Sequence, residues 1–271
     1  MKLPGKITAM AALIAGTTAN GALIVHYTFD GSDAANSGTG GAGTVGGGST
    51  FVASTAGTNA GQAWSGNRDG ANDAFIGTGL SGTALGFGAG GVYTAMAWIN
   101  WAGSDPLGSG GGRGDHMVFG QNDGAGNNAQ LHHGIRDDSA PNNIHFGGWG
   151  GPQDISDAGA VPGDGSWVHV AWQYDGTDKV VYVNGTEVTR VAGNNITDPS
   201  FEVIIGAHGR DSNNGALPGM SFRGLLDDVR IYDETLDAAA ITTAMNAVNV
   251  PEPSSLGLLG LAALGLLRRR R

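Results

Sequence analysis

Carboxylates are few and scattered in this sequence, which bears on whether the chain could hydrolyse a polysaccharide. Cleavage of a glycosidic bond uses two carboxyl groups about 5–9.5 Å apart. Residues two apart on a strand share a face, so a run that begins Glu-x-Asp would place two carboxylates on one face. The glutamates are Glu187, Glu202, Glu234 and Glu252, and each stands alone. The sequence therefore argues against a glycosidase built on that run, while two aspartates from separate strands stay open as an alternative.

Four histidines fall in neighbouring segments and raise the question of a transition-metal site. They are His116, His132, His133 and His145. Adjacent residues of a strand point to opposite faces, so His132 and His133 cannot bind one ion together without a bulge. We interpret the four as separate polar residues of strands, with a metal site as the alternative.

Trp149 stands between glycines, in a pattern typical of a strand that ends in a loop. An aromatic face in such a place can stack on a sugar ring. Arg136, Asp138, Asn142 and Asn143 lie nearby in the sequence and could supply the few polar groups that a sugar site needs. The segment therefore predicts a sugar-binding neighbourhood, and packing of Trp149 against the body of the domain is the alternative.

The N-terminus has the pattern of a secretory signal peptide. Lys2 and Lys6 give a positive start, residues 7–16 are apolar, and residues 17–22 are small. We expect cleavage after Ala22, with Ala19 as the alternative site. Residues 1–22 are thus assigned to the signal peptide.

The C-terminus combines three features in a fixed order. Pro251-Glu252-Pro253 is followed by an apolar run over residues 256–267 and by four arginines at 268–271. This order resembles the PEP-CTERM sorting signal. The resemblance implies export by a Gram-negative-type bacterium and processing by an exosortase, usually where the cell makes extracellular polysaccharide. The alternative is an ordinary C-terminal membrane anchor.

The apolar run also fits a transient membrane association. About twelve residues at about 1.5 Å each fall short of the roughly 30 Å hydrocarbon core, although arginines can snorkel to the cytoplasmic interface. Residues 250–271 are therefore assigned to sorting and membrane anchoring, which leaves residues 23–249 as the working domain.

The composition constrains how this domain is held together and what it binds. The 271 residues include no Cys and 50 Gly, with a formal net charge of −10. Without disulfides, an exported domain must rely on burial of its core, for which more than two hundred residues suffice. The acidic balance argues against nucleic acid and anionic polysaccharide as electrostatic partners and suits divalent cations. The glycine-rich residues 38–49 predict a flexible surface loop.

Short alternating apolar segments between glycine-rich turns predict an all-β domain. The sequence Asn184-Gly185 between two alternating runs favours a type I′ hairpin turn, because both residues tolerate positive φ. We therefore expect an antiparallel three-stranded meander over residues 167–190. Residues 236–247 predict one helix, capped by Asp237. The other expected strands lie at residues 23–29, 92–101, 116–121, 130–135, 144–149, 201–206 and 222–232.

Four sequence blocks resemble a known family in their order along the chain. They are residues 27–31, 166–176, 181–185 and 224–232, and they resemble concanavalin A-like lectin/glucanase domains of the laminin G-like type. The resemblance implies a single sandwich of two antiparallel sheets in jelly-roll connection. Glycosidases and lectins both occur in the family, so the resemblance leaves the activity open. The resemblance implies that a glycosidase of this fold would carry a Glu-x-Asp-x-x-Glu run, and the sequence contains no such run.

The resemblance also suggests a structural calcium ion. In jelly-roll sandwiches the terminal strands lie close together, and here Asp30 and Asp33 follow the first strand while Asp227 and Asp228 lie in the last. Strict alternation places Asp227 on the same face as Val229, which we expect to be buried. A buried carboxylate needs a counter-charge or hydrogen bonds, and Ca²⁺ prefers oxygen ligands. Related domains bind calcium; backbone N–H bonds to Asp227 without a metal are the alternative.

These observations predict an exported, surface-associated β-sandwich that binds extracellular polysaccharide without cleaving it. A structural or adhesive surface protein without a sugar pocket is the second hypothesis, and a divergent polysaccharide hydrolase is the third.

Overall fold

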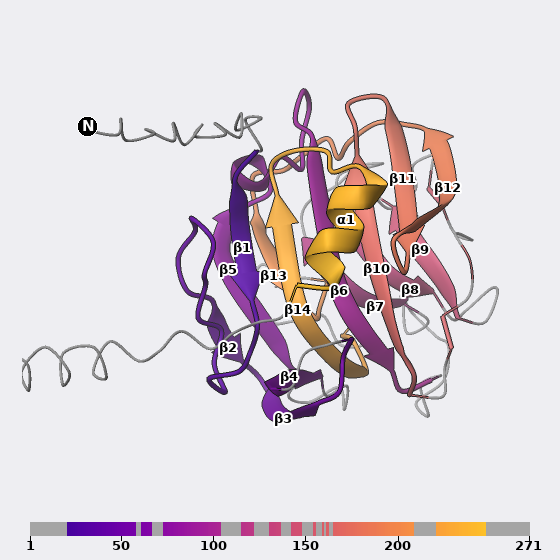
Figure 1. Ribbon diagram of the computed structural model, residues 1–271. Helices are drawn as coiled ribbons and strands as arrows, with labels where there is room; N and C mark the ends of the chain where they lie inside the picture. Colours follow the sequence, from indigo (N-terminus) through magenta and orange to yellow (C-terminus); the bar gives the residue numbers. More distant parts are fainter. Residues whose placement is uncertain are drawn as a thin grey trace, which may run out of the picture.

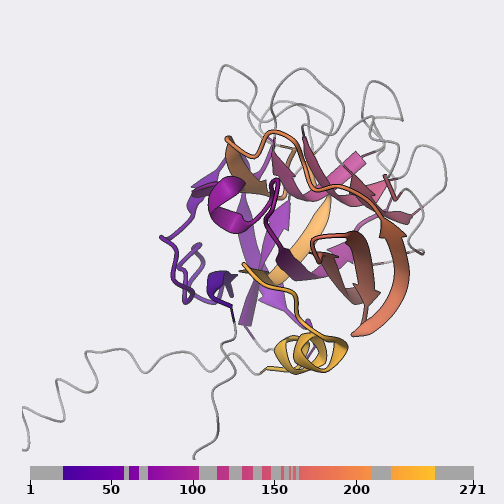
Figure 2. The same ribbon diagram turned by 90° about the horizontal axis from the view of Figure 1, so that it is seen from above.

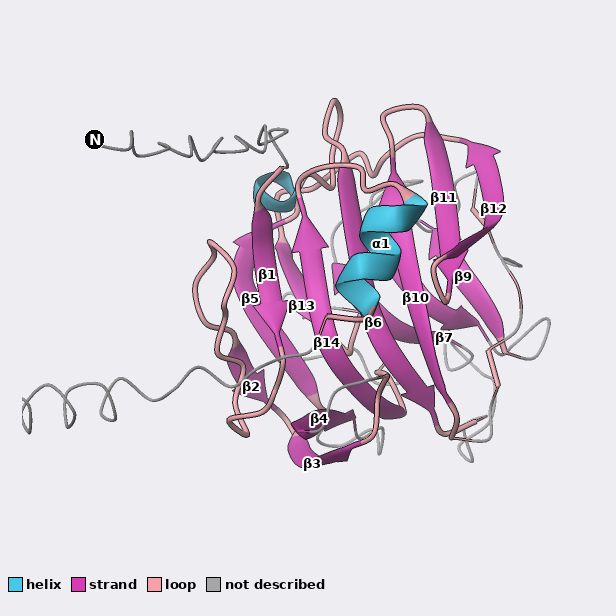
Figure 3. Cartoon of the chain, viewed as in Figure 1, coloured by secondary structure: helices cyan, strands magenta, loops and turns pink. Residues whose placement is uncertain are grey.

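The computed structural model describes residues 21–57, 61–66, 73–103, 115–121, 130–136, 142–147, 154–155, 159, 161–162, 165–208 and 221–247. Strands dominate this part of the chain, with one α-helix and a short 3₁₀ turn at Thr83–Leu85 (Figure 3). The strands form two antiparallel sheets packed as a jelly-roll sandwich, which confirms the expected all-β fold (Figure 1).

The larger sheet contains eight of the described strands. Its order is β12-β11-β10-β6-β14-β4-β3, and β1 pairs with β14 beside this path. The first strand therefore lies antiparallel to the closing strand, as expected for a jelly roll. The strands are β1 (Leu23–Tyr27), β3 (Thr50–Ser54), β4 (Gly61–Gly66), β6 (Tyr93–Trp101), β10 (Trp167–Tyr174), β11 (Asp178–Val183), β12 (Thr186–Ala192) and β14 (Gly224–Tyr232).

The smaller sheet contains six of the described strands, in the order β2-β5-β13-β7-β8-β9. Neighbours β7, β8 and β9 are consecutive in the sequence and pair as antiparallel strands. The strands are β2 (Thr44–Gly46), β5 (Phe75–Ser81), β7 (Asp115–Gln121), β8 (Leu131–Arg136), β9 (Asn143–Gly147) and β13 (Glu202–Ile205).

The core fills the space between the two sheets. Alternate residues of each strand point into it, so that Ile99 and Trp172 of the larger sheet join Phe119 and Ile144 of the smaller one. The ring of Trp172 meets that of Phe119 edge to face at 5.7 Å. Burial of such large apolar side chains is the main stabilising contribution, at roughly 25 cal/mol per Å².

The predicted meander is present over β10, β11 and β12. Asn184 and Gly185 have φ angles of 49° and 78°, as the type I′ turn requires. Val181 points into the core, whereas Val180 and Tyr182 point to the opposite face of the sheet, where they are also buried.

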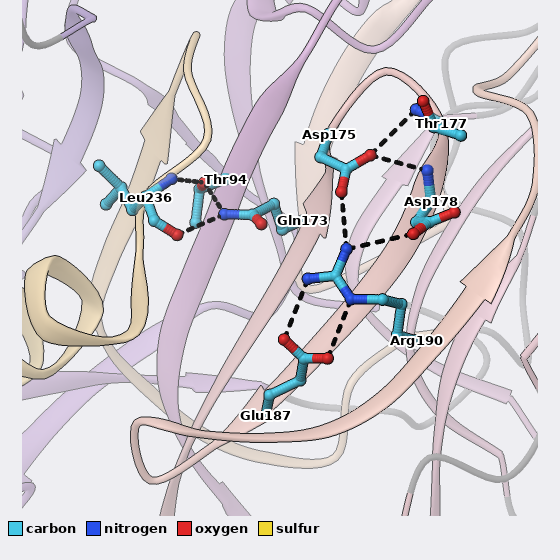
Figure 4. A network of polar contacts seen from close by, with 8 residues as sticks. All are labelled: Thr94, Gln173, Asp175, Thr177, Asp178, Glu187, Arg190 and Leu236. Carbon is cyan, nitrogen blue, oxygen red and sulfur yellow. Dashed lines mark hydrogen bonds and ion pairs between the residues drawn. The ribbon is translucent and has the colours of Figure 1, made fainter.

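That opposite face is covered by helix α1 (Ala238–Met245), which lies on the side of the larger sheet away from the smaller one (Figure 2). Asp237 caps the helix by accepting a hydrogen bond from the N–H of Ala240 at 2.7 Å, as predicted. Two side chains of the larger sheet hold the backbone of Leu236, just before the helix. Thr94 Oγ1 accepts a hydrogen bond from the N–H of Leu236, and Gln173 Nε2 donates one to the Leu236 carbonyl (Figure 4). The remaining apolar face of the helix packs on Met96 and Ala171.

The N-terminal third of the domain departs most from the sequence-based expectation. Residues 38–49 were expected to form a loop, but Thr44–Gly46 form β2 at the edge of the smaller sheet. Strands β3, β4 and β5 were not predicted, because their glycines and serines hide the alternation. Residues 1–20 of the predicted signal peptide and the PEP-CTERM segment lie outside the described residues. Within the described residues no helix has the length and apolarity to span a membrane.

Candidate functional site

The outer face of the smaller sheet carries a polar cluster across β7, β8 and β9. Residues directly opposite each other in neighbouring strands share a face. One cross-strand row joins Asp115, Arg136 and Asn143. We call this row the Arg136 row.

The Arg136 row contains two of the predicted sugar-binding residues. Arg136 Nε donates to Asp115 Oδ1 at 2.9 Å, and the side chains are 22% and 3% exposed. Asn143 is buried beside this pair. A guanidinium held by a carboxylate, next to an amide, offers fixed hydrogen-bond donors and an acceptor to a polar ligand.

Asn142 immediately precedes β9 and adopts a positive φ of 71°. Its carbonyl accepts a hydrogen bond from the N–H of Val161 at 2.7 Å, which fixes the chain at the start of the strand. The structure thus places Arg136 directly opposite Asn143, and Asn142 directly precedes Asn143. Their role in sugar binding stays a prediction. The two other predicted residues, Asp138 and Trp149, lie outside the described part of the chain.

A second cross-strand row on the same outer face contains a histidine between two glycines. Gly120 of β7, His132 of β8 and Gly147 of β9 are direct partners. His132 Nε2 contacts Nε2 of His208, which follows β13, and lies 3.2 Å from Gln130 Oε1. The ring of His145 is 6.1 Å from that of His132.

The neighbouring His133 points the other way, into the core, as the alternation predicted. Its Nε2 lies 2.7 Å from the hydroxyl oxygen of Tyr93, and burial lowers its pKa to about 3. His116 also points inward, with its ring 5.5 Å from that of Trp101. These two histidines therefore belong to the core and not to the outer cluster.

Asp227 does not lie on the face that alternation predicted. Val229 and Leu226 enter the core, but Asp227 pairs with Trp98 on the opposite face of the larger sheet. A β-bulge between Asp227 and Arg230 shifts the register and reverses the alternation. The expectation that Asp227 shares a face with Val229 is therefore wrong.

The Asp227 carboxylate is nevertheless buried and satisfied by hydrogen bonds. Oδ2 accepts from the hydroxyl of Ser54 and Oδ1 accepts from the N–H of Asp228 at 2.7 Å. Burial raises the pKa of Asp227 to about 7, and repulsion from Asp228 and Asp30 adds to this rise.

The other predicted calcium ligands turn toward different partners. Asp228 Oδ1 lies 2.7 Å from His26 Nε2 and accepts from Arg230 Nε at 2.9 Å. Asp30 accepts from the N–H of Gln62, and Asp33 from the N–H of Ala35 in its own turn. In the described ranges, no three His, Asp or Glu side chains stand arranged to hold a metal ion.

A third polar cluster on the β11–β12 hairpin has a structural explanation. Arg190 donates to Glu187 in two hydrogen bonds and to Asp175 and Asp178 at the preceding turn (Figure 4). The cluster ties the end of β12 to the β10–β11 turn and lies on the larger sheet, away from the outer cluster of the smaller one.

Two residues of the outer cluster were missed by the sequence analysis. Asp115 precedes an expected strand, and its alternation with residue 117 could have placed it on the outer face. His208 lies beyond the end of β13, in a segment with no periodic pattern that could have placed it.

Comparison with protein families identifies the domain. Residues 77–242 match the concanavalin A-like lectin/glucanases superfamily. The chain belongs to this superfamily. Residues 249–271 match the PEP-CTERM protein-sorting motif, which indicates an exported protein. No curated protein matches the chain at a significant level.

Solved structures share the fold at low sequence identity. Domain 4 of AbnA, a GH43 extracellular arabinanase from Geobacillus stearothermophilus solved in complex with arabinotriose, superposes with a TM-score of 0.60 at 20% identity. The match covers 83% of this chain and 99% of that one. The binding domain of Paraclostridial Mosquitocidal Protein 1 gives a TM-score of 0.57 at 12% identity, over 83% of this chain and 52% of the other. At these identities the likeness concerns the fold.

Proposed function

We propose that this exported concanavalin A-like domain is a non-catalytic module that binds extracellular polysaccharide at the cell surface or in the surrounding matrix. The observation that carries the proposal is the Arg136 row, in which three polar side chains share the outer face of the smaller sheet. The fold similarity to an arabinanase domain solved with arabinotriose, which covers 83% of this chain and 99% of that one, supports a sugar as the ligand.

The chemistry of the row suits a neutral sugar. Asp115 offsets the charge of Arg136, so the pair presents directed hydrogen bonds with little net charge. The partial exposure of Arg136 gives a ligand access to the row, and Asn143 adds an amide that can both donate and accept. Asp138 and Trp149 remain part of the proposed neighbourhood as its second carboxylate and its stacking surface.

Binding without cleavage is favoured by the carboxylates in the described part of the chain. Asp227 has a pKa of about 7, as a general acid would need, but it is 1% exposed and bonded to Ser54. A substrate has no access to such a group. Release of reducing ends from the polysaccharide would instead establish the hydrolase alternative.

A pull-down with extracellular polysaccharide from the producing organism tests the proposal. Wild type is expected to sediment with the polymer, whereas Arg136→Ala and Asn143→Ala are expected to stay in solution. Arg190→Ala is the matched control, because it removes an arginine from a carboxylate network on the other sheet. Equal binding by all three variants would favour the adhesive alternative without a sugar pocket.

The proposal also includes a structural calcium ion between the terminal strands. Its proposed carboxylate ligands are reduced to Asp30 and Asp227. The mutual repulsion of these two carboxylates supports it, since a shared cation would relieve that repulsion. Asp228 is engaged by Arg230 and Asp33 by its own turn. These two are therefore removed from the proposed ligand set.

Processing at the PEP-CTERM motif by an exosortase is also part of the proposal. Pro251, Glu252 and Pro253 would mark the segment to be removed. The intact mass of protein from the producing cells tests this step: loss of residues 256–271 supports it, and their retention supports a permanent anchor.

A further inference from the structure

A row of accessible side chains crosses five strands on the outer face of the larger sheet. Direct cross-strand pairing places its members side by side. The adjacent residues Ile99, Trp101 and Val168 point into the core, so the row points away from the smaller sheet. We call it the Trp167 row, and its members are Trp167 of β10, Asn100 of β6, Leu225 of β14, Ser65 of β4 and Thr50 of β3.

Other parts of the chain cover the rest of this face. Helix α1 covers one part of it (Figure 1). Residues 54–57 cover the row next to the Trp167 row, where Trp98 and Asp227 are direct partners. The hydroxyl of Ser54 donates to Asp227, and Gly57 lies so close to Trp98 that a Cβ atom would meet its ring at 2.6 Å. The members of the Trp167 row are all partly or fully exposed, so a ligand can reach them.

Trp167 supplies an aromatic ring in a fixed orientation. Its Nε1 donates a hydrogen bond to Thr55 Oγ1 at 3.2 Å. Thr55 belongs to the segment that covers the adjacent row, so this bond ties the indole to the border of the covered area. A side chain that is ordered before binding loses little conformational entropy when a ligand arrives. The indole is therefore suited to stack on the C–H face of a sugar ring.

The other members of the row add polar groups without adding charge. Asn100 donates from Nδ2 to the carbonyl of Gly165, which fixes its amide beside Trp167. The hydroxyls of Ser65 and Thr50 lie at the opposite end of the row, and each can donate one hydrogen bond and accept two. An apolar ring with a few uncharged polar groups is the chemistry that recognises a neutral sugar.

The same chemistry disfavours other classes of partner. The row contains no charged side chain, and the chain has a formal net charge of −10, so a nucleic acid gains no electrostatic attraction here. A stable protein interface needs about 800 Å² on each partner around an apolar centre. Trp167 and Leu225 are the only apolar members of the row, which is too few for such a centre.

We propose that the Trp167 row is a second contact surface for a neutral polysaccharide, through which one protein molecule bridges two polymer chains. Its five strands lie about 4.8 Å apart, so the row is about 19 Å long and spans several sugar rings. The Trp167 row and the Arg136 row lie on opposite sheets and face away from each other. They therefore contact different chains, or distant parts of one chain.

The inference rests on the proposed function, because the Arg136 row makes the first attachment. The Trp167 row lies on the open face of a sheet and gives each sugar ring few contacts. It binds only a chain long enough to span it, and it adds to the affinity of a protein that is already held on the polymer. Short oligosaccharides consequently occupy the Arg136 row alone.

The test compares the neutral polysaccharide of the producing organism with short oligosaccharides released from it. Affinity electrophoresis in gels that contain the polymer measures polymer binding, and isothermal titration measures oligosaccharide binding. Trp167→Ala is expected to weaken polymer binding at least about tenfold and to leave the oligosaccharide isotherm unchanged. Phe201→Ala is the matched control, since it removes an exposed aromatic ring outside both rows, and it should change neither measurement.

A second variant and a second measurement make the result independent of the folding of Trp167→Ala. Leu225→Asp places a charge in the middle of the row and should weaken polymer binding in the same way. Light scattering from wild type mixed with the polymer should rise as chains are bridged, and neither variant should cause this rise. Circular dichroism shows whether each variant is folded.

The failure of this inference is distinct from the failure of the proposed function. Wild type that binds oligosaccharides, but shows no rise in scattering or the same polymer affinity as both variants, would overturn the second surface alone. Wild type that binds neither the oligosaccharides nor the polymer would overturn the proposed function and this inference with it.

Discussion

The Nε2 atom of His26 and the Oδ1 atom of Asp228 lie 2.7 Å apart, which links the first strand to the closing strand through side chains as well as through their backbone ladder. Arg230 Nε donates to the same oxygen at 2.9 Å. Burial by itself raises the pKa of Asp228, but the bonds to His26 and Arg230 hold that pKa below its ordinary value. The carboxylate is therefore charged at neutral pH.

Asp228→Asn should lower the free energy of unfolding by about 3 kcal/mol, because it leaves the buried Arg230 without its counter-charge. Urea denaturation followed by circular dichroism measures the change. Asp33→Asn is the control, since Asp33 lies in an exposed turn, and it should cost less than about 0.5 kcal/mol. Equal midpoints for the two variants would show that the ion pair does not stabilise the junction.

Val181→Asp should lower the free energy of unfolding by roughly several kcal/mol, because it buries a carboxylate that has no partner. Val181 is fully buried in the core between the sheets. Thr186→Ala, in an exposed position directly after the hairpin turn, should be nearly neutral. Thermal melts of both variants compare the two sites, and melting temperatures within a degree or two of wild type for both would contradict the register of β11.

The pH dependence of stability should include a contribution from His169. Burial lowers the pKa of His169 to about 4, with Asp228 raising and Arg230 lowering it, and its ring lies 5.4 Å from that of Trp98. The unfolded chain has a histidine pKa of about 6.5, so unfolding takes up a proton between these two values. Stability should therefore fall as the pH drops from 6.5 toward 4, by up to about 1.4 kcal/mol per pH unit from this residue.

His169→Gln should make the fall of the unfolding free energy with decreasing pH shallower by up to about 1.4 kcal/mol per pH unit. This change in slope is independent of the effect of the substitution on stability at pH 7. Urea denaturation at several pH values between 4.5 and 7 gives the two slopes. Parallel slopes for wild type and variant would mean that His169 gains its proton at the same pH in the folded and unfolded chains.

Calcium should raise the melting temperature if Asp30 and Asp227 share an ion. Extracellular sites bind at about 10⁻⁴–10⁻³ M, and a 100-fold excess over Kd adds about 2.7 kcal/mol, or roughly 5–10 °C for a domain of this size. The melting temperatures of wild type in EDTA and in tens of millimolar CaCl₂ measure this. Asp227→Asn should abolish the rise in melting temperature. An unchanged melting temperature of wild type in CaCl₂ would contradict the proposed calcium site.

The sequence was sufficient to predict the parts of the fold where turn or capping residues stand at the ends of regular apolar patterns. Asn184-Gly185 set the hairpin, and Asp237 set the helix start. The orientation of Asp227 could not be obtained in this way. Asp228 adopts a φ of 49° within a bulge, and a single extra residue moves every preceding side chain to the other face.

The candidate site was predictable only where its residues lie in consecutive strands. Arg136 and Asn143 come from strands joined by a short connection, so proximity in sequence brought them together. His208 reaches the cluster through the pairing of β13 with β7, a contact between segments more than eighty residues apart. Such pairings depend on how the sheets are wound, which the pattern within each segment does not specify.

Binding to the polysaccharide of the producing organism tests the central claim most directly. The measurement is an isothermal titration of wild type and Asn143→Ala with oligosaccharides released from that polymer. The account predicts a saturable isotherm with one site per wild-type chain, and at least a tenfold weaker one for Asn143→Ala, or about 1.4 kcal/mol. No heat of binding with wild type, or the same isotherm for both proteins, would contradict it.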